Sequence, residues 1–104
     1  MIRPGTVALA ILDPTKGTEQ AGTRPVIVIG GPYNWDSIII VVPLSTTNRG
    51  WGTHVAVMTN RVSYALCEQV RAISTSRVTR ELGVVSNDDL AEVQQTTARL
   101  IGVY

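Results

Sequence analysis

The sequence predicts a mainly β protein with one C-terminal helix, and three observations lead to this fold class. Short apolar runs, rich in β-branched residues, recur through the first 70 residues. Glycine, proline and asparagine, the residues that form turns, lie between these runs. After residue 85 the apolar spacing changes from that of strands to that of a helix. Several short strands at this spacing are typical of a small barrel or sandwich.

Five strands are expected in the first part of the chain. The third expected strand is a run of five β-branched residues, which predicts burial on both of its faces. Residues 72–80 are ambiguous, and we expect there the end of a strand and then a short helical turn. The five expected strands are Thr6–Leu12, Pro25–Ile29, Ile38–Val42, His54–Met58 and Tyr64–Glu68.

The expected helix begins after Ser86, because Ser86-Asn87-Asp88-Asp89 is a helix-capping sequence. The serine hydroxyl accepts from amides of the first turn, and the carboxylates lie at the positive end of the helix. Gly102 is expected to end the helix. We expect it to cover one side of the barrel in a structural role. The residues expected on its buried face are Leu90, Val93, Thr97, Leu100 and Ile101.

Length and composition limit the function classes. A chain of 104 residues is expected to form a single domain over residues 1–104. Its composition, 44% hydrophobic and 16% charged with a net charge of +1, excludes intrinsic disorder. One cysteine, Cys67, and one histidine, His54, exclude an internal disulfide and a four-ligand Cys/His zinc site. We expect no metal and no cofactor. We expect the protein to be located in the cytoplasm. The longest apolar stretch, Ile38 to Leu44, is far shorter than the about 20 residues of a membrane helix, so no membrane partner is expected.

The segment Asp13–Pro25 is the most unusual part of the chain. It joins two expected strands with mostly polar or small residues and is long for a connection in so small a domain. Long loops in compact domains often bind ligands. It contains the carboxylate of Glu19 and the guanidinium of Arg24, and a second polar cluster, Ser45–Asn48, follows the third expected strand. If the two strands are neighbours, Arg24 and Ser45 lie at a shared rim, where these groups suit phosphate-ester chemistry.

Charge is unevenly distributed along the chain. Residues 1–80 carry a net charge of +4 and residues 81–104 a net charge of −3, and eight of the nine cations are arginine. The planar donors of arginine match phosphate oxygens. Two interpretations remain open, an ordinary solvated surface and a phosphate-binding N-terminal part beside an acidic, structural C-terminal part.

Asp13–Pro25 strongly resembles the first signature of the MazF/PemK family of toxin endoribonucleases. Pro43-Leu44-Ser45-Thr46 is similar to that family's Pro-x-Thr-Thr/Ser motif, and Cys67–Arg71 to its Asp-Gln-x-Arg/Lys motif. The resemblance extends over nearly the whole chain. It implies an SH3-like β-barrel with a C-terminal helix, assembled as a homodimer. It also implies a MazE-like antitoxin as partner.

The activity that the resemblance implies is sequence-specific, metal-independent cleavage of single-stranded RNA. Attack by the ribose 2′-hydroxyl would give a 2′,3′-cyclic phosphate and a 5′-hydroxyl. The same fold also occurs in the gyrase poison CcdB, and fold alone does not determine activity. The alternative is therefore a non-catalytic SH3-like binding module or a CcdB-like gyrase poison.

Three candidate catalytic residues follow from the resemblance. Arg24 matches the catalytic arginine, and we expect it to stabilise charge on the phosphate, because a guanidinium is a poor proton donor at neutral pH. Ser45 matches the catalytic threonine and would donate to a phosphate oxygen, unless it bonds its own backbone in a turn. Glu19 matches a residue proposed as the base, unless it serves to hold the loop.

Six further residues are expected to bind RNA or line its site: Thr18, Gln20, Thr46, Glu68, Gln69 and Arg71. Glu68 and Gln69 either read base edges or orient the loop, and Arg71 contacts either phosphate or the second protomer of the dimer. Some relatives have a histidine at the position of Thr18 and an arginine at the position of Leu66. We therefore expect this chain not to use the histidine–aspartate–arginine set of those relatives. His54 is expected to be structural, and Trp35 and Trp51 either stack on bases or pack against protein.

Overall fold

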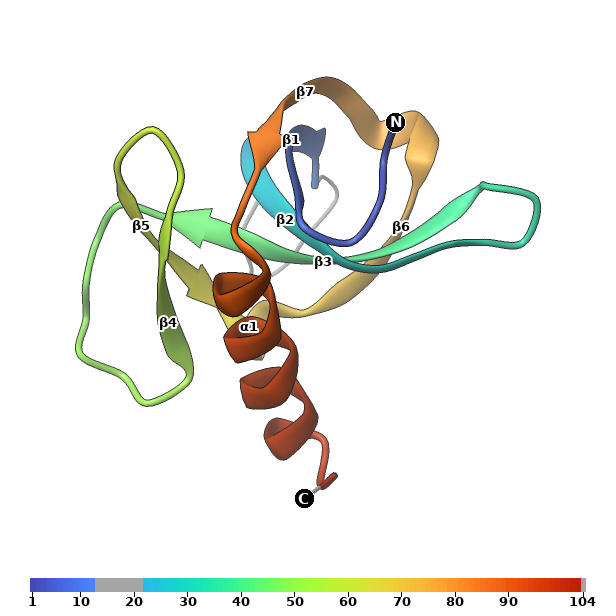
Figure 1. Ribbon diagram of the computed structural model, residues 1–104. Coiled ribbons are helices and arrows are strands. Elements are labelled where there is room, and N and C mark those ends of the chain that lie inside the picture. Colours follow the sequence, from blue (N-terminus) through green and yellow to red (C-terminus); the bar gives the residue numbers. More distant parts are fainter. Residues whose placement is uncertain (13–21, 104) are drawn as a thin grey trace.

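The computed structural model describes residues 1–12 and 22–103, and a strongly curled antiparallel sheet with one helix makes up this part of the chain (Figure 1). Its strands are β1 (Thr6–Ile11), β2 (Thr23–Tyr33), β3 (Ile38–Ser45), β4 (His54–Met58), β5 (Val62–Leu66), β6 (Arg71–Ser74) and β7 (Val78–Val84). Its helices are the short 3-10 helices η1 (Cys67–Gln69) and η2 (Thr75–Arg77) and the α-helix α1 (Asn87–Leu100). None of the helices described is long and apolar enough to cross a bilayer.

The strands pair in the order β4-β5-β3-β2-β1-β7, and β6 pairs with β3 outside this path. The long strand β3 is shared: its first half pairs with β6 and its end with β5. The predicted mainly β fold with a C-terminal helix is confirmed. The expected SH3-like barrel is present in an open form, because the path of paired strands ends at β4 on one side and at β7 on the other.

The core lies on both faces of the sheet, as two clusters of buried side chains. Alternate residues of β3 belong to different clusters: Val42 and Leu44 face one, and Ile39 and Val41 the other. This alternation confirms the predicted burial of β3 on both faces. The first cluster also contains Val93 of α1, so the helix covers that side of the sheet, as expected.

The helix begins as predicted and ends beyond the sheet. Ser86 Oγ accepts a hydrogen bond of 3.1 Å from the Asp89 amide, and Gly102, at φ +91°, follows the helix end. The buried face is correct for Val93 and Thr97. It is wrong for Leu100 and Ile101, which are 44% and 70% exposed. Figure 1 shows the reason, since the C-terminal end of α1 projects away from the sheet.

Several strand boundaries differ from those predicted. β2 starts at Thr23 and runs to Tyr33, through glycines that suggested a turn, because two register shifts against β3 accommodate them. β5 ends at Leu66, since the chain turns through η1 to move from the end of β3 to its first half. The strand and helical turn expected within residues 72–80 are β6 and η2. The strand β7 that follows was not predicted.

Candidate functional site

The pairing of β2 with β3 places Arg24 and Ser45 at the same end of two adjacent strands. Val26 lies opposite Pro43 in this antiparallel pair. Arg24 is two residues before Val26 and Ser45 two residues after Pro43, and in an antiparallel pair both steps lead in the same direction. The strands are thus neighbours, as a shared rim requires. Arg24 is exposed and Ser45 is partly buried.

Leu12 and Gly22, the described residues on either side of positions 13–21, lie at this same end. The Leu12 amide donates a hydrogen bond of 2.9 Å to the Gly22 carbonyl, which joins the two described residues that flank the segment. Ile11 lies opposite Thr23 in the β1–β2 pair, next to Arg24. Three sequence-predicted site residues lie outside the described residues: Thr18, Glu19 and Gln20.

The hydroxyl of Ser45 is oriented by the turn that follows β3. Its Oγ accepts a hydrogen bond of 3.1 Å from the Thr47 amide. This is the turn contact that the sequence left open for Ser45. It uses an oxygen lone pair, and the hydroxyl proton is a separate donor. The local bond is therefore compatible with donation to a phosphate oxygen.

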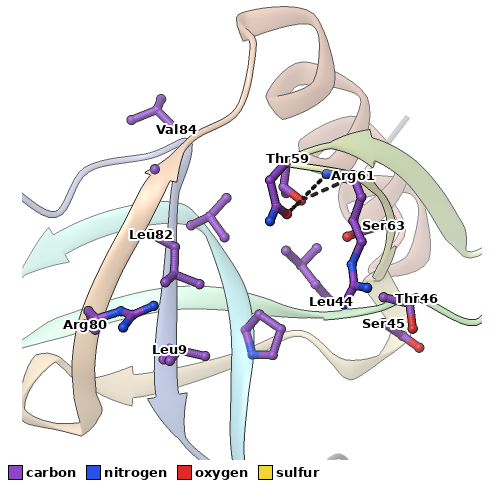
Figure 2. Close-up of a pocket in the computed structure, with 14 residues that line it drawn as sticks. Leu9, Leu44, Ser45, Thr46, Thr59, Arg61, Ser63, Arg80, Leu82 and Val84 are labelled. Atoms are coloured by element: carbon purple, nitrogen blue, oxygen red, sulfur yellow. Dashed lines mark hydrogen bonds between the residues drawn. The ribbon is translucent and has the colours of Figure 1, made fainter.

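Ser45 and Thr46 line one end of a groove with a volume of about 530 Å³. The groove lies where the strand path is open, between β7 and the hairpin formed by β4 and β5 (Figure 2). Arg80 of β7 and Arg61 of the hairpin line opposite walls, and none of the described lining residues is acidic. Such a groove attracts anions. Its apolar surface comes from Val7, Leu9, Pro25, Leu44, Leu82 and Val84.

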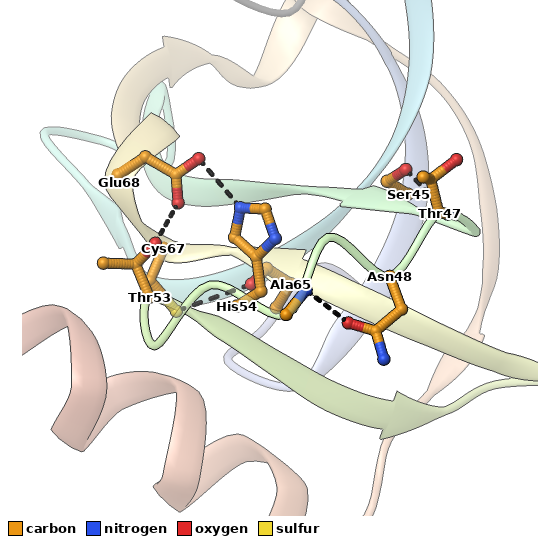
Figure 3. Close-up of polar contacts among 9 residues, drawn as sticks. Ser45, Thr47, Asn48, Thr53, His54, Ala65, Cys67 and Glu68 are labelled. Carbon is orange, nitrogen blue, oxygen red and sulfur yellow. Dashed lines mark hydrogen bonds and ion pairs between the residues drawn. The ribbon is translucent and has the colours of Figure 1, made fainter.

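Polar side chains also surround the carboxylate of Glu68, which lies in η1 (Figure 3). Thr53 Oγ1 donates to Oε1 at 2.8 Å, and His54 Nε2 lies 3.0 Å from Oε2. The His54 side chain is only 2% exposed, whereas that of Glu68 is 27% exposed. Burial by itself would raise the pKa of Glu68, but the hydrogen bonds from His54 and Thr53 outweigh it and lower the pKa below its ordinary value. Glu68 is therefore ionised at neutral pH.

The surroundings of His54 show which ring nitrogen donates to Glu68. Nδ1 is buried and has no hydrogen-bond partner among the described residues. A proton there would leave a buried N–H without an acceptor, at a cost of about 1–3 kcal/mol. Nε2 faces the ionised Glu68 carboxylate, which only accepts hydrogen bonds, so Nε2 carries a proton and donates to it.

Three other residues of the segment Cys67–Arg71 have clear positions. Arg71 is partly buried, and its Nη1 donates to the Leu12 carbonyl at 2.9 Å. Gln69 is the partly buried last residue of η1. Cys67 is fully buried, and this burial raises the pKa of its thiol. The cysteine is therefore protonated at neutral pH and unsuited to act as a nucleophile.

Comparison with known proteins gives the family. Residues 3–101 match the family described as the PemK-like, MazF-like toxin of type II toxin-antitoxin systems. The chain belongs to this family. It is 29% identical to the endoribonuclease MazF of Staphylococcus saprophyticus, over 100% of this chain and 94% of that protein. The MazF/PemK resemblance seen in the sequence is thereby confirmed.

Solved structures of MazF/PemK relatives share the fold. A crystal structure of MazF from Deinococcus radiodurans aligns with a TM-score of 0.84 and 24% identity, over 95% of this chain and 94% of that chain. A crystal structure of MazE-MazF from the same organism aligns with a TM-score of 0.75 and 20% identity, over 96% and 94% of the two chains.

Beside the MazF/PemK motifs, the structure presents residues that sequence reasoning missed. Arg61 and Arg80 line one groove, and Thr53 and His54 hold Glu68. No sequence motif marks Arg61 and Arg80, because they are distant in the sequence and only the fold of the open sheet places them opposite each other. Among residues 1–12 and 22–103, no three His, Cys, Asp or Glu side chains are grouped so as to hold a metal ion.

Proposed function

We propose that this MazF/PemK protein is a sequence-specific endoribonuclease that cleaves single-stranded RNA without a metal ion. The observation that carries the proposal is the placement of Arg24 and Ser45 at one end of the β2–β3 pair, beside a groove lined by two arginines. The S. saprophyticus relative, which carries the name endoribonuclease, supports it. The exposed guanidinium and the hydroxyl are the donors that a phosphate in transfer requires.

The proposed reaction is an internal transfer of the phosphate. The ribose 2′-oxygen bonds to phosphorus as the bond to the 5′-oxygen breaks. A base removes the 2′-hydroxyl proton, and the leaving 5′-oxygen takes up a proton, which gives a 2′,3′-cyclic phosphate and a 5′-hydroxyl. Arg24 stabilises the charge on the phosphate, and Ser45 donates to a non-bridging oxygen. Glu19 remains the candidate base.

The proposal extends to assembly and partner. The D. radiodurans MazE-MazF structure supports a MazE-like antitoxin as the partner of this chain. A homodimer is supported by apolar side chains at the C-terminal end of the helix, where Leu100, Ile101 and Val103 are 44%, 70% and 60% exposed. We place this single-domain toxin in the cytoplasm, where its RNA substrate is found.

A cleavage assay tests this function. Purified protein is mixed with a long single-stranded RNA of mixed sequence, in parallel samples with and without EDTA, and the 5′ ends of the products are mapped. Discrete cuts that share a short sequence and carry 5′-hydroxyl ends are expected. No cleavage by the folded protein, or cleavage that EDTA abolishes, would contradict the proposal. The first outcome would favour a non-catalytic binding module or a CcdB-like gyrase poison.

A further inference from the structure

Both carboxylate oxygens of Glu68 are held by His54, the first residue of β4, and by Thr53, which precedes it. Thr53 Oγ1 donates to Oε1 at 2.8 Å, and His54 Nε2 donates to Oε2 at 3.0 Å. The backbone reinforces the contact, because the Cys67 amide donates to the Thr53 carbonyl at 3.1 Å. A carboxylate with both oxygens bound in this way has a single orientation, and 27% of the Glu68 side chain still faces solvent.

The His54 ring also contacts an exposed aromatic ring. The centroids of the His54 and Trp51 rings are 4.9 Å apart, and the His54 amide donates to the Trp51 carbonyl at 3.1 Å. Trp51 is 53% exposed, and the Arg49 guanidinium lies 5.8 Å from its ring centroid. One buried imidazole therefore contacts both a solvent-facing indole and an ionised, solvent-facing carboxylate.

These two groups have the chemistry of base recognition. An exposed indole offers a surface on which any base stacks. An ionised carboxylate only accepts hydrogen bonds, so it pairs with amino groups on base edges. Adenine, cytosine and guanine carry an amino group, whereas the one donor on the base-pairing edge of uracil, N3–H, lies between two carbonyl oxygens that repel a carboxylate. A fixed carboxylate beside bound RNA would therefore discriminate against uracil.

We propose that His54 is a positioning residue for RNA recognition. With Thr53 it fixes the Glu68 carboxylate as the acceptor for a base amino group, and it supports Trp51 as a stacking surface. The chain then prefers adenine, cytosine or guanine over uracil at one position of its target. This inference rests on the proposed function, since it requires RNA as the ligand.

A pool of short RNAs with randomised sequence tests the proposal. The pool carries 2′-O-methyl riboses, which block the attack and make the readout binding alone. The RNA retained by the protein is sequenced. For the wild-type protein we expect depletion of uracil at one position of the enriched sequence.

Two substitutions of His54 form a matched pair. In H54Q the amide nitrogen reaches the place of Nε2 and keeps the bond to Glu68, whereas in H54N it reaches only the place of Nδ1. We expect H54Q to retain the discrimination against uracil and H54N to lose it, with binding of the selected RNA weakened about 10-fold. Thr53→Val should act like H54N without disturbing the buried ring. Thr79→Val, an exposed threonine on β7, is the control and should behave like the wild type.

The outcomes separate this inference from the proposed function. Thermal unfolding of each variant shows whether it folds. Enriched sequences that are the same in the wild type, H54N and Thr53→Val would overturn the positioning role, even if RNA is cleaved. Uracil at every enriched position of the wild-type pool would also overturn it. Selective binding without cleavage of ordinary RNA would support the inference and contradict the endoribonuclease proposal instead.

Discussion

Arg71 Nη1 donates a 2.9 Å hydrogen bond to the backbone carbonyl of Leu12, 59 residues earlier in the chain. Leu12 is fully buried, and its amide is bound to the Gly22 carbonyl at 2.9 Å. Arg71 thus satisfies the backbone carbonyl of Leu12, the residue immediately before the family signature Asp13–Pro25. The predicted contact of Arg71 with RNA stays a prediction, but the side chain also has this structural role.

Replacing Arg71 by methionine should destabilise the protein. Arg71→Met keeps an unbranched apolar stem but removes the donor, so the buried Leu12 carbonyl loses its side-chain partner. We expect a loss of about 1–3 kcal/mol in the free energy of unfolding, measured by urea denaturation. Arg3→Met, at an exposed position, is the control and should stay within about 0.5 kcal/mol of the wild type. Equal stability of both variants would show that the Leu12 contact contributes nothing.

The capping serine of α1 offers a second stability test. Ser86→Ala removes the acceptor for the Asp89 amide and should cost about 1 kcal/mol in the free energy of unfolding. Ser86→Asp retains an acceptor oxygen at the same position and should stay close to wild type. Chemical denaturation followed by circular dichroism measures both. If alanine and aspartate give the same stability, the cap has no energetic role.

The hydrogen bonds to Glu68 predict a pH dependence. His54 and Thr53 lower the pKa of Glu68 in the folded state below its unfolded value, in spite of partial burial. Its contribution to stability is therefore present above the ordinary glutamate pKa of 4.5 and is lost as the pH falls through the folded-state pKa. Glu68→Gln should lose less stability than the wild type between neutral and acidic pH. Identical pH profiles in urea denaturation would contradict this assignment.

The proposed catalytic residues predict specific losses of rate. Arg24→Ala removes the charge at the phosphate and should lower kcat by about 10²–10³-fold. Ser45→Thr keeps the hydroxyl and should cleave RNA, whereas Ser45→Ala should not do so efficiently. Single-turnover cleavage of a mapped RNA site measures these rates, and circular dichroism checks the fold. Wild-type rates in both alanine variants would refute the site.

The arginines of the groove predict a change in salt dependence. Arg61 and Arg80 line opposite walls, and a contact with an RNA phosphate releases counterions. If RNA lies in the groove, Arg61→Gln or Arg80→Gln should reduce the slope of log affinity against log salt by about 0.7 each. Fluorescence anisotropy with uncleavable RNA at several salt concentrations measures the slope. Arg3→Gln serves as the control, and an unchanged slope in both groove variants would exclude the groove from the RNA path.

Local features of this protein were determined by the sequence alone. Ser86 and Gly102 mark the two ends of the helical region, because capping is an interaction among residues a few positions apart. The strand His54–Met58 has the predicted bounds, since alternation is read within five residues. The family motifs are likewise contiguous and were recognised without a structure.

Tertiary structure decided which distant residues meet. β3 is shared by β5 and β6, so the chain turns at Cys67–Gln69 where a continued strand was predicted. Leu100 has the helical spacing of a buried residue but is 44% exposed at the end of α1, where the described residues cover it only in part. The contact of His54 with Glu68 depends on the pairing of β4 with β5. The physical reason is that capping and strand alternation act between neighbours in sequence, whereas burial and strand pairing depend on the whole sheet.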